Sequence, residues 1–114
     1  VFFAGDSGYN SVQFKEIGEK FAPVDLGLIP IGVYSPRDFM EVVHVNSEDS
    51  VKIHQEVGCR FSIGIHWGTF PLASEPIDEP PIKLRQAMLE ARLKPEDFRA
   101  LKIGESSILP KNKV

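Results

Sequence analysis

The sequence predicts an α/β fold, because short apolar runs alternate along the chain with segments of helical periodicity. The apolar runs, which we expect to form buried strands, cover residues 1–4, 26–29, 61–65 and 101–103. The helical segments cover residues near 12–21, 46–57 and 82–92, with shorter turns starting at Pro36 and Pro95. Strands and helices that follow one another in this way are typical of a sheet flanked by helices.

Start and stop residues support the first helix. Ser11 is a suitable N-cap, and Pro23 is expected to end the helix because proline cannot continue it. Phe14, Ile17 and Phe21 recur at helical spacing, so we expect them to share one face that packs against the core.

The second and third helices carry similar signals. Asn46 can cap the second helix, and Glu48 and Asp49 lie in its first turn, where the helix dipole favours negative charge. Gly58 supplies its C-terminal stop. The third helix should bury the face that carries Leu84, Met88 and Ala91.

Size and charge limit the classes of function. The 114 residues suit one modest domain or a piece of a larger one. Thirteen Lys and Arg against sixteen Asp and Glu give a formal charge of −3, so electrostatics give no reason to expect a nucleic-acid partner. The single cysteine, Cys59, excludes an intramolecular disulfide and is expected to be a packed thiol.

The apolar runs indicate neither a signal peptide nor a membrane helix. Residues 1–5 are apolar but lack a basic segment. The longest apolar run, 26–34, is interrupted by Pro30 and is shorter than the about 20 residues that a membrane helix needs. The chain starts directly on an expected strand, whereas domains usually begin with tolerant surface residues. We therefore expect a piece of a larger domain.

Two residues with metal-binding side chains directly follow expected strands. Asp6 comes after the strand at 1–4, and His66 comes after the strand at 61–65. In open sheets flanked by helices, ligands bind in the crevice outside the carboxyl ends of the strands, so these two side chains could converge there. Each also has a structural alternative, because Asp6 could form an Asx turn and His66 could be a packed ring. Together they favour a metal or catalytic site.

Three further residues have a functional and a structural interpretation. His44 precedes the Asn46 cap, so it could contact substrate near a helix N-terminus, which favours phosphate, or it could fix its own loop. Trp67 opens a proline-rich loop, residues 67–81, which could form a substrate-binding wall or pack against the third helix. His54 falls within the second helix and is expected to be structural or at the surface.

The candidate ligands are too few for a complete zinc site. A catalytic zinc ion takes at least three protein ligands, and Asp6 and His66 are two. The sequence has no His-x-His or His-x-x-x-His pair, no P-loop, no Gly-x-Ser-x-Gly elbow and no Gly-x-Gly-x-x-Gly after the first strand. Either no metal binds, or the remaining ligands lie outside this sequence.

Four runs of residues are specific enough to indicate a family. They are Phe2-Phe3-Ala4-Gly5-Asp6-Ser7-Gly8-Tyr9, Leu28-Ile29-Pro30-Ile31-Gly32-Val33-Tyr34, His44-Val45 and Ile65-His66-Trp67-Gly68-Thr69-Phe70. Over nearly its whole length the chain resembles the C-terminal half of the N-acyl-phosphatidylethanolamine-hydrolysing phospholipase D family, within the metallo-β-lactamase superfamily. This resemblance implies the C-terminal half of an αββα sandwich. Residues 1–114 would then be the C-terminal part of one domain whose N-terminal half is absent.

The resemblance also implies roles for individual residues. Asp6 matches the aspartate that bridges two metal ions in the family, and His66 matches its last histidine ligand, so both become the expected catalytic and metal-binding residues. The family's His-x-His-x-Asp-His cluster would lie upstream of Val1. His44 and Trp67 become expected substrate-contacting or supporting residues.

The implied activity is two-metal phosphodiester hydrolysis, with zinc as the expected cofactor. N-acyl-phosphatidylethanolamine would be cleaved to an N-acylethanolamine and phosphatidic acid, with the 67–81 loop as a wall for acyl chains. The expected partners are the phospholipid substrate, a membrane surface that the parent protein contacts peripherally inside the cell, and either a second copy or the missing half. The isolated 114 residues are expected to be inactive.

Three alternatives stay open. Another hydrolase of the superfamily, such as a sugar-phosphate lactonase, would share the metal ligands. A phosphoacceptor receiver domain also has an aspartate at a strand end, but it needs an acidic pair that does not accompany Asp6. A non-catalytic interaction module would follow if half a sandwich leaves an apolar sheet face uncovered, since such a piece would dimerise, swap or pair with the missing half.

Overall fold

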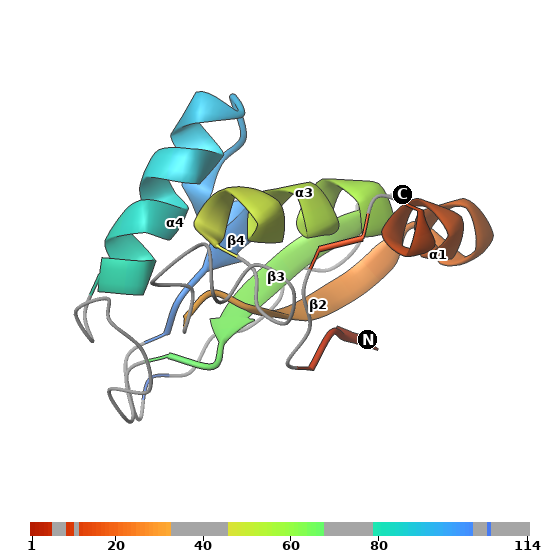
Figure 1. Cartoon of the computed structure of the whole chain (residues 1–114), viewed down its shortest axis with the longest axis horizontal. Coiled ribbons are helices and arrows are strands. Elements are labelled where there is room, and N and C mark those ends of the chain that lie inside the picture. Colours follow the sequence, from red (N-terminus) through yellow and green to blue (C-terminus); the bar gives the residue numbers. More distant parts are fainter. Residues whose placement is uncertain (6–8, 11, 33–45, 68–78, 102–104, 106–114) are drawn as a thin grey trace.

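The computed structural model describes residues 1–5, 9–10, 12–32, 46–67, 79–101 and 105, in which strands and helices alternate (Figure 1). The strands are β1 (Phe2–Phe3), β2 (Val24–Pro30), β3 (Cys59–Ile65) and β4 (Phe98–Arg99). The helices are α1 (Gln13–Phe21), α3 (Ser47–Val57), α4 (Glu79–Glu90) and the 3-10 turn η1 (Pro95–Asp97). The α/β prediction is confirmed.

The four described strands form one parallel sheet in the order β1-β2-β3-β4. One row of paired residues crosses the whole sheet and consists of Phe3, Leu28, Ile63 and Arg99. Because all strands are parallel, their carboxyl ends lie at the same end of the sheet. The residues that follow β1 and β3 therefore leave the sheet on either side of β2.

The described helices lie on one face of the sheet (Figure 1). Helix α3 packs against β2 and β3, with α1 beside it at one end and α4 beside it at the other. The core fills the space between these helices and the sheet. Its fully or almost fully buried apolar members are Phe14, Ile29, Ile31, Val51, Ile53, Val57, Cys59, Leu84, Ala87, Met88 and Phe98.

The opposite face of the sheet is apolar and carries none of the described helices. Ser62 contacts α3, so strand alternation directs its neighbours to the other face. The half-buried members of that face in β2 and β3 are Leu26, Leu28, Phe61, Ile63 and Ile65. The expectation that residues 1–4 are buried is wrong, because β1 is an edge strand and Phe3, on this face, is 66% exposed.

Helix α1 starts at Gln13, one residue after the predicted start, and ends at Phe21 as predicted. Asn10 supports its start, because its Oδ1 accepts hydrogen bonds from the backbone N–H groups of Val12 at 2.8 Å and Gln13 at 3.0 Å. The predicted cap, Ser11, lies outside the described residues. Phe21 was expected to be buried but is 63% exposed. The helix approaches α3 most closely one turn earlier, at Gly18, where any Cβ would overlap the backbone of α3.

Both predicted ends of α3 are confirmed. Asn46 Oδ1 accepts a hydrogen bond from the backbone N–H of Asp49 at 2.9 Å, and Gly58 adopts the left-handed conformation with φ 75° and ψ 39°. The left-handed conformation is costly for residues with a Cβ, which explains why glycine stands at this end.

The third helix starts earlier than predicted, and a further short strand follows it. Helix α4 starts at Glu79 rather than at residue 82, because Pro80 and Pro81 fit the first turn, where no backbone N–H is needed. The last described strand is β4 at Phe98–Arg99, which the sequence analysis did not predict. Phe98 is 1% exposed and fills the core beside β3, so the sheet pairs there. Residues 102–103 and the turn predicted at Pro36 lie outside the described residues.

A polar pair is buried between α3 and the sheet. His54 is 5% exposed, and its Nδ1 lies 2.7 Å from Ser62 Oγ, with the Phe98 ring 5.2 Å away. His54 is therefore structural and not at the surface. Burial lowers the pKa of His54, and the nearby Asp97 carboxylate partly opposes this change. Cys59 is buried, which confirms it as a packed cysteine, and this burial raises the pKa of its thiol.

We predict that His54 makes stability depend on pH. The lowered pKa keeps its imidazole neutral in the folded state, whereas the unfolded chain binds a proton below about pH 6.5. The stabilisation is therefore present above about pH 6.5 and is lost as the pH falls through the folded pKa. The midpoint of thermal unfolding should drop between about pH 7.5 and about pH 5, and His54→Gln should reduce that drop. The same drop in both proteins would contradict the assignment.

Candidate functional site

The candidate site begins at the carboxyl end of β3. His66 directly follows Ile65, the last residue of the strand, and its backbone has a φ of 62°. The chain therefore turns sharply at the histidine, in a left-handed conformation that residues with a Cβ rarely adopt. Its side chain is half-buried, with Nδ1 shielded from solvent. The predicted position of His66, directly after the strand, is confirmed.

The end of β2 lies directly against this turn. The backbone N–H of Ile31 donates to the carbonyl oxygen of Ile65 at 3.0 Å, which extends the strand pairing by one residue. The next residue, Gly32, packs against the backbone of His66: a Cβ on Gly32 would overlap the His66 carbonyl oxygen and would lie 3.1 Å from Trp67 Cβ. The two strand ends are thus in close backbone contact.

A buried serine of α3 holds the end of β2 from the helix side. The Ser50 hydroxyl oxygen lies 2.5 Å from the carbonyl oxygen of Pro30 and 2.9 Å from that of Asn46. Ser50 has no solvent exposure. Because buried carbonyl groups need a partner, this contact stabilises the position of the last residue of β2.

Trp67 is half-buried and packs against the hydrophobic core. This packing supports the structural interpretation of the tryptophan. Its predicted role in substrate contact stays a prediction, and residues 68–78 of the predicted wall lie outside the described residues.

The end of β1 forms the third part of the candidate site. The backbone N–H of Ala4 donates to the carbonyl oxygen of Leu28 at 3.0 Å, and Gly5 then adopts a left-handed φ of 69°. The strand therefore also ends in a turn. Asp6 and His44, the other predicted site residues, lie outside the described residues.

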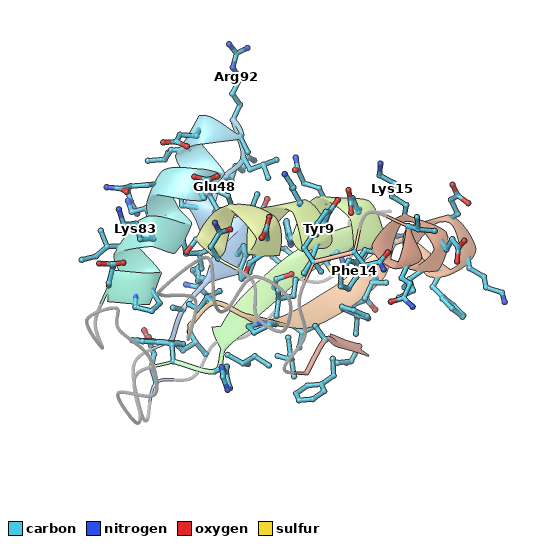
Figure 2. The ribbon with its side chains drawn as sticks, viewed as in Figure 1. Tyr9, Phe14, Lys15, Glu48, Lys83 and Arg92 are labelled. Atoms are coloured by element: carbon cyan, nitrogen blue, oxygen red, sulfur yellow. The ribbon has the colours of Figure 1, made fainter. Side chains whose placement is uncertain are left out.

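Tyr9 anchors the chain shortly after β1. Its hydroxyl donates to Glu56 Oε1 at 2.6 Å. Its ring stacks on Phe14 with centroids 6.0 Å apart, and Figure 2 labels both side chains. Lys52 Nζ lies 5.5 Å from the centre of the same ring. The hydrogen bond to the Glu56 carboxylate, together with burial, raises the pKa of Tyr9 to about 12.

The described residues do not form a complete metal site. Among them, no group of three or more His, Cys, Asp or Glu side chains could hold a metal ion. A neutral imidazole is nevertheless a common ligand of zinc, so the donor at His66 fits a divalent metal. The described part of the chain therefore contributes one predicted ligand.

Three supporting residues were missed by sequence reasoning. Gly32 and Ser50 act through contacts between strands and a helix that are distant in sequence, and Tyr9 acts through α3. A serine inside a helix was the one available signal, because such a hydroxyl often bonds a backbone carbonyl.

Comparison with known proteins identifies the family. Residues 1–67 match the family model described as the beta-lactamase superfamily domain. The chain belongs to the beta-lactamase superfamily. The chain also resembles a solved structure, that of Igni18, a novel metallo hydrolase from the hyperthermophilic archaeon Ignicoccus hospitalis. The match has a TM-score of 0.62 and 23% sequence identity, and it covers 91% of this chain and 39% of the Igni18 chain. This likeness supports the superfamily fold.

Two relatives have a higher sequence identity to this chain than Igni18 has. The N-acyl-phosphatidylethanolamine-hydrolyzing phospholipase D 1 of Caenorhabditis elegans is 48% identical over 107 residues, which are 91% of this chain and 30% of the relative. The mitochondrial N-acyl-phosphatidylethanolamine-hydrolyzing phospholipase D of Saccharomyces cerevisiae is 39% identical over 74% of this chain and 18% of the relative. The chain thus spans less than a third of these relatives. Within its described part, no helix is long and apolar enough to cross a bilayer.

We predict that Tyr9→Phe lowers the free energy of unfolding by about 1–2 kcal/mol, because it removes a hydrogen bond to a carboxylate while keeping the stacked ring. The measurement is urea unfolding at neutral pH. Lys52→Met is the matched control, because it removes the cation near the ring and leaves the hydroxyl bond, so its effect should be smaller. A Tyr9→Phe protein as stable as the parent would contradict this role.

Proposed function

We propose that the protein carrying this chain is a metal-dependent phosphodiesterase that hydrolyses N-acyl-phosphatidylethanolamine to an N-acylethanolamine and phosphatidic acid. The observation that carries the proposal is the placement of His66: an imidazole in a sharp turn at the carboxyl end of β3, in contact with the end of β2. Membership of the superfamily and the 48% identity to the C. elegans relative of that name support the same reading.

The spacing of the strands suits a two-metal centre. Adjacent strands lie about 4.8 Å apart, so the ends of β1 and β3, which flank β2, are about 10 Å apart. Ligands of one metal centre must bring their donor atoms closer together than these strand ends, so side chains that follow them have to turn toward β2. Short side chains that follow β1 and β3 can meet that requirement. This supports Asp6 and His66 as ligands of one centre.

We assign the two residues different tasks. The Asp6 carboxylate would join both ions and partly offset their charge, and the His66 imidazole would bind one ion through a ring nitrogen while its other nitrogen meets a hydrogen-bond acceptor. Two bound divalent ions, with zinc as the expected metal, would supply Lewis-acid activation of a phosphate oxygen and of water. The remaining ligands would come from outside this chain, so we expect the 114 residues alone to be inactive.

The proposal extends to the surroundings of the site. Residues 1–114 would form the C-terminal part of one domain, and the apolar face of β2 and β3, which carries none of the described helices, would pack against the rest of it. His44 and Trp67 would contact or support the substrate. The parent protein would meet its phospholipid peripherally at an intracellular membrane, as a homodimer or paired with the remaining half.

We predict that Asp6→Asn and His66→Ala, each made in the full protein that carries this chain, lose bound metal and phospholipid hydrolysis. Loss of one ligand from a centre with few protein donors should empty at least one metal position. Elemental analysis measures metal per protein, and His54→Gln is the control, because His54 is buried against Ser62 away from the strand ends. Two retained metal ions in either site variant would contradict the assignment.

A separate experiment tests the substrate. The full protein that carries this chain, loaded with zinc, should convert N-acyl-phosphatidylethanolamine in vesicles to N-acylethanolamine and phosphatidic acid. A chelator should stop this hydrolysis. Product analysis by mass spectrometry measures this directly. Hydrolysis of a sugar-phosphate lactone with no lipid product would contradict the assigned substrate and would favour a lactonase.

A further inference from the structure

We propose that Gly32 is a positioning residue for His66. Because glycine has no Cβ, the His66 backbone can lie directly against Gly32, in the conformation that would direct the imidazole toward the metal. This inference rests on the proposed function, because it treats His66 as a metal ligand. It assigns a role to a residue that would not itself touch metal or substrate.

The contact forms where the paired strands end. Pro30 of β2 lies opposite Ile65 of β3, and the hydrogen bond from Ile31 continues the pairing to that point. Gly32 and His66 directly follow Ile31 and Ile65, the residues that this hydrogen bond joins. A Cβ on Gly32 would overlap the carbonyl oxygen of His66 and would lie 3.2 Å from its carbonyl carbon. The opposing atoms belong to the backbone and are not the end of a flexible side chain.

The contact between Gly32 and the His66 peptide is flanked by packed residues on both sides. The end of β2 is held by the Ser50 hydroxyl against the Pro30 carbonyl. On the other side, Trp67 packs against the hydrophobic core. An added methyl group at Gly32 would therefore displace the peptide between His66 and Trp67.

The backbone conformation of His66 makes that peptide sensitive. A left-handed φ is costly for a residue with a Cβ, and it persists only where the surroundings determine it. Gly32 is part of those surroundings. Relief of the overlap needs a shift of about 1 Å, whereas metal–ligand bonds tolerate about 0.2 Å. The imidazole would then no longer reach the metal with good geometry.

Gly64 is a matched control, because it lies in β3 two residues before His66. A Cβ there would meet the side chain of Ile31, with Cδ1 at 2.6 Å and Cγ1 at 3.0 Å. Gly64→Ala thus adds the same methyl group to the same pair of strands, but the atoms it crowds belong to a side chain and not to the His66 backbone. It should lower stability without moving the His66 peptide.

The test uses the full protein that carries this chain, stripped of metal and titrated with zinc against a competing chelator. Gly32→Ala should weaken the binding of one zinc ion by about 10–100-fold, the size expected for a residue that orients a ligand. Gly64→Ala should keep the parent affinity. Thermal unfolding of the metal-free proteins reports stability separately, and the absorption spectrum of the cobalt-loaded proteins reports ligand geometry.

The outcomes separate this inference from the proposed function. Unchanged zinc affinity in His66→Ala would reject the metal site itself. Loss of affinity in His66→Ala, with parent affinity and an unchanged cobalt spectrum in Gly32→Ala, would reject only the role of Gly32. Equal losses in Gly32→Ala and Gly64→Ala, or a Gly32→Ala protein that does not fold, would also overturn it, because the glycine would then serve the fold and not the ligand.

Discussion

The parallel pairing of β2 with β3 supports the rest of this structure. The two strands pair from Val24 and Cys59 to Pro30 and Ile65, so they begin and end together. Helix α3 packs across both, and β1 and β4 are short strands added at their outer edges. Because the pair ends in register, the residues that follow it emerge side by side, and this places Gly32 against His66.

Local signals in the sequence predicted most of this framework. The cap at Asn46 and the stop at Gly58 act through hydrogen bonds and backbone conformation within a few residues, so they could be read correctly. The errors concern tertiary packing. Phe21 was predicted to share one face with Phe14 and Ile17 and is exposed, because α1 meets α3 one turn earlier, at Gly18.

The candidate site shows the same division. The position of His66 at a strand end followed from the apolar run before it, and the resemblance to a family supplied its role. The supporting contacts of Gly32 and Ser50 depend on which strand lies beside β3 and which helix covers it, so spacing along the chain could not reveal them. Asp6 and His44 lie outside the described residues, and their roles stay predictions.

The central claim is that His66 binds a metal ion from the end of β3. The most direct test is a crystal structure of the full protein loaded with zinc, with anomalous diffraction data collected at the zinc edge. The account predicts an anomalous peak about 2.0–2.1 Å from a ring nitrogen of His66. Zinc bound elsewhere in the protein, with the His66 ring packed away from it, would contradict the account.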